Sequence, residues 1–178
     1  MLISEQLRRG SIAEYLLYMW QTEDLVRACG CSFQRVRDEI VAKFDCTAEE
    51  REELTDWYGD IVRMMNKEGK RQGGHLQINE VTLQAMEELH SRLLQSTSQP
   101  FYNAAYYKAL PFIVELRKKG AAAKGEVETC LEALYGTMLL RLGGKPVSGE
   151  TEQAVGQIGT LVGLLSDYYK KDKVTVIE

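Results

Sequence analysis

A chain of 178 residues is long enough for one domain, and its apolar fraction of 44% and charged fraction of 27% are typical of globular proteins. The net charge is −4, and residues 1–98 carry 12 basic and 17 acidic side chains, which argues against a nucleic-acid surface. No apolar run approaches the roughly 20 residues of a transmembrane helix, and four scattered cysteines do not suit a disulfide scaffold. We therefore expect a cytoplasmic protein with reduced thiols and with no membrane or nucleic-acid partner.

Helical periodicity dominates the first half of the chain. We expect helices over residues 11–29, 32–44 and 47–68, because apolar residues recur at intervals of three and four along each of them. A Ser or Thr at the first position of each segment can cap it. A basic, glycine-rich loop over residues 69–75 follows.

The second half continues the same pattern. We expect helices over residues 79–95 (capped by Asn79), 101–119 (with Pro111 inside), 124–142, and from 150 or 151 to 171, and then either a frayed tail or an extended segment over 174–178. Seven helices with mostly short loops predict an all-α fold, a single-domain bundle over residues 1–178.

Three segments of the chain carry a resemblance to known sequences. They are IAEYLLYMWQTEDLV at residues 12–26, GHL at 74–76 and YYKALPFIVELR at 106–117. These segments resemble a family of short bacterial all-helical proteins, about 180 residues long, with no assigned function. The resemblance spans nearly the whole chain. It implies a helical fold and a bacterial source, and it implies no activity, ligand or catalytic residue.

Glu23 is the most unusual residue of the first helix. At about 100° per residue it falls at the centre of an apolar face that includes Leu16 and Met19. A carboxylate buried on such a face needs a partner or a raised pKa. Glu23 is therefore a candidate acid, base or ligand anchor. The alternatives are a structural pair with Arg, Lys or Tyr from a neighbouring helix, or exposure at a gap in the bundle.

The two histidines are candidate ligand-binding residues. Glu87 and His90 lie three apart on one helix face, the spacing found in di-iron bundles. Such a site needs a second Glu–His motif and further carboxylates, whereas His75 lies in the glycine-rich loop. We therefore assign no metal and no cofactor, and we interpret His90 as a hydrogen-bonded boundary residue. The loop around His75 is either an anion site or a solvated connector.

Aromatic residues concentrate before Pro111. Tyr102, Tyr106 and Tyr107 precede it, and Pro111 cannot donate a hydrogen bond to the carbonyl of Tyr107, so the helix is expected to bend or divide there. A bend flanked by tyrosyl hydroxyls is a candidate ligand pocket. The alternative is a curved core helix.

Three glycines lie along one side of the last helix. Gly156, Gly159 and Gly163 each cost about 1 kcal/mol relative to alanine inside a helix. A close approach of another backbone, within the bundle or across a dimer, is the expected compensation.

No catalytic motif accompanies these candidates. The chain has no Gly-x-Ser-x-Gly sequence, and neither histidine has an evident Ser or Cys partner. We favour a non-enzymatic helical protein that acts through protein contacts, as a homo-oligomer or adaptor. The alternative is a small-molecule-binding bundle or enzyme, in which Glu23 shares a pocket near Pro111 with at least two of the other candidates. A DNA-reading regulator is disfavoured by the acidic first half.

Overall fold

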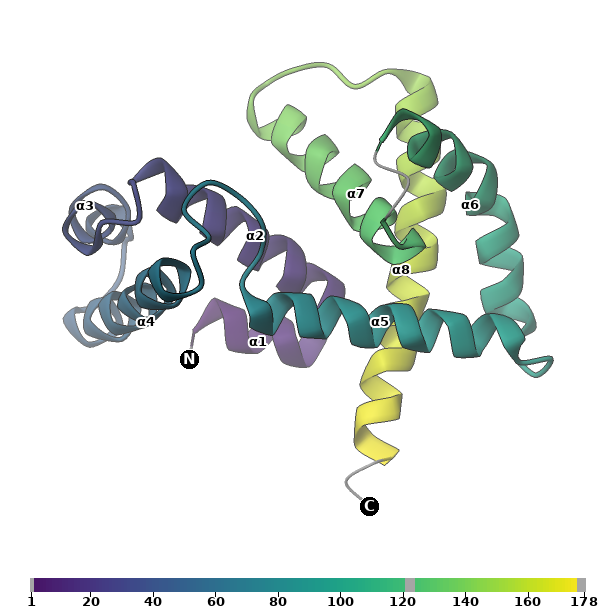
Figure 1. Cartoon of the computed structure of the whole chain (residues 1–178), viewed down its shortest axis with the longest axis horizontal. Coiled ribbons are helices and arrows are strands. Elements are labelled where there is room, and N and C mark those ends of the chain that lie inside the picture. Colours follow the sequence, from purple (N-terminus) through teal and green to yellow (C-terminus); the bar gives the residue numbers. More distant parts are fainter. Residues whose placement is uncertain (1, 121–123, 176–178) are drawn as a thin grey trace. The chain divides into compact units, whose positions relative to one another are not determined.

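The computed structural model describes residues 2–120 and 124–175, and every regular element within them is helical. The elements are α1 (Ile3–Gly10), α2 (Ile12–Ala28), α3 (Phe33–Glu39), the 3₁₀ turn η1 (Val41–Lys43), α4 (Ala48–Lys67), α5 (Gln77–Gln95), α6 (Pro100–Lys119), α7 (Glu126–Leu142) and α8 (Gly149–Thr175) (Figure 1). The predicted all-α fold class is confirmed. None of these helices is long and apolar enough to cross a bilayer.

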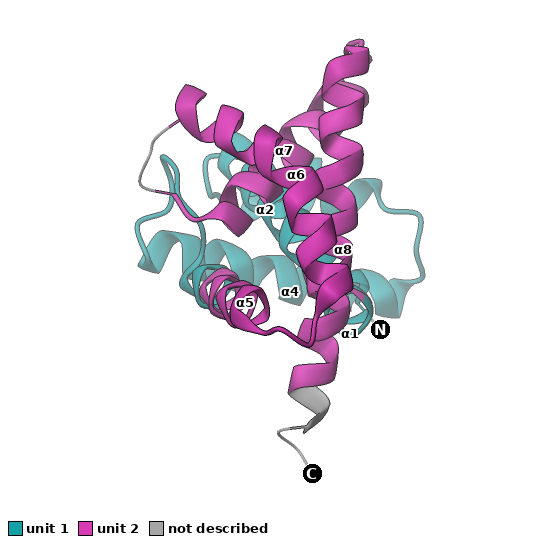
Figure 2. Cartoon of the chain, turned by 90° about the vertical axis from the view of Figure 1, so that its right-hand side faces the viewer, with its two compact units in different colours: residues 1–10, 14–81 teal, residues 11–13, 82–178 magenta. Residues whose placement is uncertain are grey.

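The chain divides into two compact units (Figure 2). Unit 1 comprises Met1–Gly10 and Glu14–Val81, and unit 2 comprises Ser11–Ala13 and Thr82–Glu178. Helices α2 and α5 therefore each contribute residues to both units. The organisation of the chain as one domain stays a prediction.

In unit 1, a capping box fixes the start of α4. Thr47 Oγ1 accepts the N–H of Glu50 at 3.2 Å, and the carboxylate of Glu50 accepts the N–H of Thr47 at 2.9 Å. Further along α4, Trp57 stacks on Tyr18 of α2 with ring centroids 6.1 Å apart. Helix α3 packs against α4, and Asn66 of α4 donates to the carbonyl of Cys31 before α3 at 3.0 Å.

The predicted helix over residues 32–44 is wrong in its second half. Helix α3 ends at Glu39, and η1 replaces its continuation. Val36 and Val41 are both buried, and residues five apart lie about 140° apart around an α-helix, so a tighter turn is needed to bury both. Ser32 occupies the N-cap position, but its side chain makes no capping hydrogen bond to the described residues.

Two further features of unit 1 were not expected. Helix α1 lies over residues for which we predicted no element. Helix α5 begins two residues before Asn79, which therefore lies inside the helix rather than at its cap.

In unit 2, α6, α7 and α8 pack against one another. Their contact surfaces bury Ile113, Leu131, Ile158 and Leu165 almost completely. Helix α6 stays continuous through Pro111, and its ribbon changes direction along its length (Figure 1). Pro111 lies on an exposed side of α6, where water can reach the carbonyl that it leaves without a donor.

The ends of the last two helices differ slightly from the prediction. Helix α7 begins at Glu126, and α8 extends from Gly149 to Thr175, so residues 174 and 175 are helical. The remainder of the predicted tail, residues 176–178, lies outside the described residues. All four cysteines are free, as expected, and three of them are buried.

Candidate functional site

The predicted ligand-binding residues form two clusters, one within each unit. Glu23 and His75 meet in unit 1, whereas His90, Tyr102 and Tyr106 meet in unit 2. The side chain of Tyr107 belongs to neither hydrogen-bonded cluster and is 68% exposed.

The carboxylate of Glu23 is fully buried and is surrounded by donors. Its Oε1 accepts the backbone N–H of Leu76 at 2.9 Å and the side-chain amide of Asn79 at 2.7 Å. Its Oε2 lies 2.7 Å from Nδ1 of His75 and 3.7 Å from Nη2 of Arg27. This set of partners suits an acceptor-only carboxylate. The alternative of a structural pair with an Arg, Lys or Tyr of a neighbouring helix is not what the structure has. The carboxylate binds residues at and just before the start of α5, and Arg27 of its own helix.

Two more contacts close the Glu23 cluster. Trp20 stacks on the ring of His75 with centroids 4.4 Å apart and an interplanar angle of 15°. Arg27 donates to the carbonyl of Gly74 at 2.8 and 3.3 Å. The cluster therefore fastens the loop before α5 to α2. Asn79 is 1% exposed, and its Oδ1 has no hydrogen-bond partner among the described residues.

The basic side chains of the glycine-rich loop bind other side chains of the same protein. Lys70 pairs with Glu80 at 2.9 Å, and Arg71 donates to Asn66 at 2.6 Å. Both cations thus have intramolecular partners, which favours the connector interpretation of this loop.

The second cluster is centred on His90, which is 4% exposed. Its Nδ1 lies 2.6 Å from the hydroxyl of Tyr102, and its Nε2 lies 3.1 Å from Glu126. Tyr106 donates to the other oxygen of Glu126 at 3.2 Å. Arg117 approaches that same oxygen at 3.9 Å. The cluster therefore joins α5, α6 and α7.

Burial raises the pKa of Tyr102 far above its ordinary value, so its hydroxyl stays protonated beside Nδ1 of His90. The cavity at this cluster has a volume of about 10 Å³, which is at the lower limit for a single water molecule. The cluster therefore has no room for a substrate, and its polar side chains form hydrogen bonds with one another.

Glu87, the other half of the Glu–His motif, binds the first turn of α7. Its Oε1 accepts the N–H of Glu128 at 2.9 Å, where the helix dipole favours a negative charge. Gly125 permits this approach, because a Cβ at that position would overlap the carboxylate. Burial nevertheless raises the pKa of Glu87, and this effect outweighs the lowering by its hydrogen bonds and by His90.

The raised pKa of Glu87 predicts a pH dependence of stability. The folded carboxyl holds its proton more tightly than the unfolded one, so its contribution is greatest below about pH 4.3 and is lost as pH rises through the folded pKa. Glu87→Gln keeps the acceptor for Glu128 and removes the charge. Urea denaturation at pH 4 and pH 7 should therefore show a smaller fall of stability with pH for Glu87→Gln than for the wild type. Parallel pH profiles would contradict this assignment.

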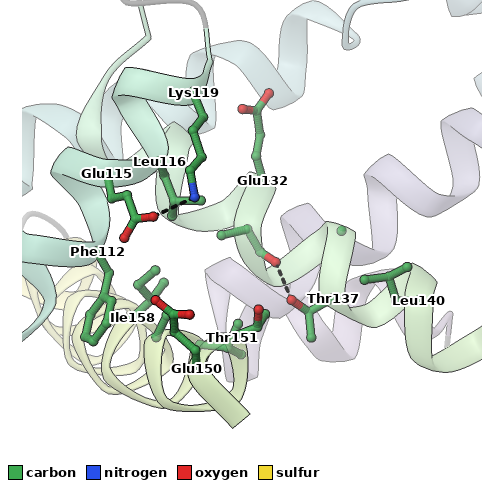
Figure 3. Close-up of a pocket in the computed structure, with 14 residues that line it drawn as sticks. Phe112, Glu115, Leu116, Lys119, Glu132, Thr137, Leu140, Glu150, Thr151 and Ile158 are labelled. Carbon is green, nitrogen blue, oxygen red and sulfur yellow. Dashed lines mark hydrogen bonds and ion pairs between the residues drawn. The ribbon is translucent and has the colours of Figure 1, made fainter. Parts of the chain in front are cut away.

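Unit 2 also contains a pocket that none of the predicted candidates lines. It has a volume of about 330 Å³ and is formed by the second half of α6, the middle of α7 and the first half of α8 (Figure 3). Phe112, which follows Pro111, is part of its wall, whereas Tyr102, Tyr106 and Tyr107 are not. This pocket is therefore a different one from the predicted pocket, which was expected to be lined by Glu23 and by the tyrosines before Pro111. Gly136, a glycine in the interior of α7, is the feature of the sequence that could have indicated this pocket.

The glycine side of α8 lacks the expected close packing inside the chain. A Cβ added at Gly156 or Gly163 would meet no described atom within 4 Å, and one at Gly159 would meet only Leu134, at 4.0 Å. The prediction of a close backbone approach within the bundle is therefore wrong for the described residues. An approach across a dimer stays a prediction.

Apolar side chains are exposed instead along one side of α6, which we call the outward face. Phe101 is 82% exposed, Tyr107 68% and Val114 42%. Ala104 and Pro111 lie between them and are also exposed. These five residues are three or four positions apart, so they form one stripe along the helix.

Among the described residues, no group of three or more His, Cys, Asp or Glu side chains could hold a metal ion. The helices and clusters thus define an all-α protein with buried polar clusters and an open pocket within unit 2. The chain belongs to a family described as a domain of unknown function (DUF4924), whose model matches residues 1–175. The resemblance to a helical family without an assigned function is confirmed, and the bacterial source stays a prediction. Comparisons with curated proteins and with solved structures found no similar protein.

Proposed function

We propose that the protein acts through protein–protein contacts and that two copies pair through the outward face of α6. The observation that carries this proposal is the apolar stripe of that face. The opposite side of α6 packs Tyr102, Ala105, Ala109 and Ile113 into the core of unit 2. A helix that is apolar on both sides is expected to be covered on both sides.

A second copy is the partner that this face suits best. A two-fold interface must be self-complementary, so that a residue near one end of the helix meets a residue near the other end. Antiparallel pairing centred near Tyr107 sets the Phe101 end of one helix beside the Val114 end of its partner. Both ends are apolar, and the stripe between them measures about 20 Å at 1.5 Å per residue.

The size of this surface sets the expected affinity. An interface built mainly on one pair of helices is smaller than the roughly 1,600 Å² of a standard interface. We therefore expect a dimer with a dissociation constant of about 1–10 μM, which corresponds to roughly −8 to −7 kcal/mol.

Sedimentation velocity over a concentration series tests the pairing. Tyr107→Glu brings two carboxylates close to the two-fold axis, so the dissociation constant should rise at least tenfold. Tyr107 is mostly exposed, and its replacement should leave the fold intact, which circular dichroism checks.

Leu142→Glu is the matched control for this experiment. Leu142 is 66% exposed at the end of α7 and is not one of the residues of the outward face of α6. This variant should dimerise as the wild type does. The proposal is refuted if the wild type stays monomeric at 100 μM, or if Tyr107→Glu and Leu142→Glu weaken the dimer equally.

A further inference from the structure

We infer that the pocket between α6, α7 and α8 binds a small organic cation with an apolar body. This inference goes beyond the proposed dimer, because its residues are distinct from the outward face of α6. The pocket volume of about 330 Å³ lies within the usual range of ligand pockets. All of its lining residues belong to unit 2.

Small residues keep the pocket open. Ala133 and Gly136 line it from α7, and Ala154 lines it from α8. A Cβ at Gly136 would meet no described atom within 4 Å, so no packing contact at that point requires a glycine. Glycine is also unfavourable inside a helix. The sequence therefore leaves space at a position where a larger apolar side chain would fill the pocket and favour the helix.

The inner surface of the pocket suits an apolar body. Phe112 and Leu116 line it from α6, and Val155 and Ile158 line it from α8. Ile158 is fully buried beneath it. An alkyl chain or a ring placed on these side chains would remove apolar surface from water on both partners.

The charges around the pocket determine which charged head group a ligand can carry. Carboxylates of Glu115, Glu132 and Glu150 come from three different helices, and the ammonium of Lys119 is the counter-charge among the lining residues (Figure 3). Lys119 is already bonded to Glu115, and Glu132 is paired with Lys124. Within residues 2–120 and 124–175, Glu150 has no cation within 4 Å, and its charge acts on Lys119 only from a greater distance. An ammonium head group complements this arrangement, whereas a carboxylate or phosphate is repelled.

Titration calorimetry with three probes of equal chain length tests the inference. Octyltrimethylammonium should bind the wild type with a dissociation constant below about 1 mM, octanol should bind more weakly, and octanoate should bind least. Gly136→Leu, which fills the space beside α7, should weaken binding of the cation at least tenfold. Glu150→Gln should weaken the binding of the cation about threefold and leave the affinity for octanol unchanged.

Gly163→Leu provides the matched control, because it places the same side chain on the open face of α8 outside the pocket. It should bind the cation as the wild type does. The inference is overturned if the cation does not bind at 5 mM, if octanoate binds as tightly as the cation, or if Gly136→Leu and Gly163→Leu bind alike. None of these outcomes depends on the dimer, which sedimentation of the same variants reports separately.

Discussion

Glu23→Leu should lower the free energy of unfolding by about 4 kcal/mol, the largest loss that we expect from a single substitution in this chain. The leucine fills most of the volume but accepts no hydrogen bond. The N–H of Leu76 and the amide of Asn79 would then be buried without an acceptor, and each such group costs about 1–3 kcal/mol. His75 is partly exposed and can turn to water, so it should add less.

Urea denaturation measures this effect, and a matched pair of variants makes it specific. Glu52→Leu makes the same change at an exposed position of α4 and should alter stability by no more than about 0.5 kcal/mol. Glu23→Gln keeps the size and one acceptor oxygen but turns an NH₂ group toward other donors, so about 2 kcal/mol should be lost. A loss below 1 kcal/mol for Glu23→Leu would show that the carboxylate does not hold the start of α5.

The double substitution Gly156→Ala with Gly163→Ala should raise the free energy of unfolding by about 1–2 kcal/mol, because each glycine lies inside α8 with open space where a Cβ would project. The two positions are seven residues apart, about 10 Å along the helix, so their effects should add. For a chain of this length the melting temperature should rise by roughly 3–6 °C.

Gly59→Ala is the control for this prediction. A Cβ at Gly59 of α4 would lie 3.2 Å from the ring of Phe33, so the gain in helix propensity should be offset by crowding. Sedimentation of the double variant adds a second result. If alanine at positions 156 and 163 abolishes the dimer, then the copies meet through the glycine side of α8, as the sequence suggests, and not through α6.

Local periodicity allowed most of the helices to be predicted. The stripe of α4 and its Thr47–Glu50 capping box are patterns within a few residues, and both are present. The prediction failed where several local patterns are compatible with the same residues. Asn79 is a good N-cap residue, yet its amide binds Glu23 and α5 begins before it. Val81 lies at an apolar position within α5 and is nevertheless 58% exposed.

The sequence singled out Glu23 and His90 but did not show which residues bind them. Periodicity placed Glu23 on an apolar face, and it is fully buried. Its three hydrogen-bond partners, His75, Leu76 and Asn79, lie more than 50 positions away in the chain, and Glu126 lies 36 positions from His90. No spacing rule connects such residues. Gly136, like the glycines of α8, lies inside a helix where the sequence gives no reason for a glycine. This feature could have been noticed in the sequence as an indication of the pocket.

The sequence by itself determined the all-α class, most of the helices, the free thiols and the burial of Glu23, because each depends on residue type and on spacing along one helix. Only the tertiary structure decided that Glu23 holds the start of α5, that His90 is closed in by Tyr102 and Glu126, and that three helices leave a pocket at Gly136. These features depend on how segments far apart in the chain pack together. Packing against distant segments also decides which of two apolar faces of a helix is covered.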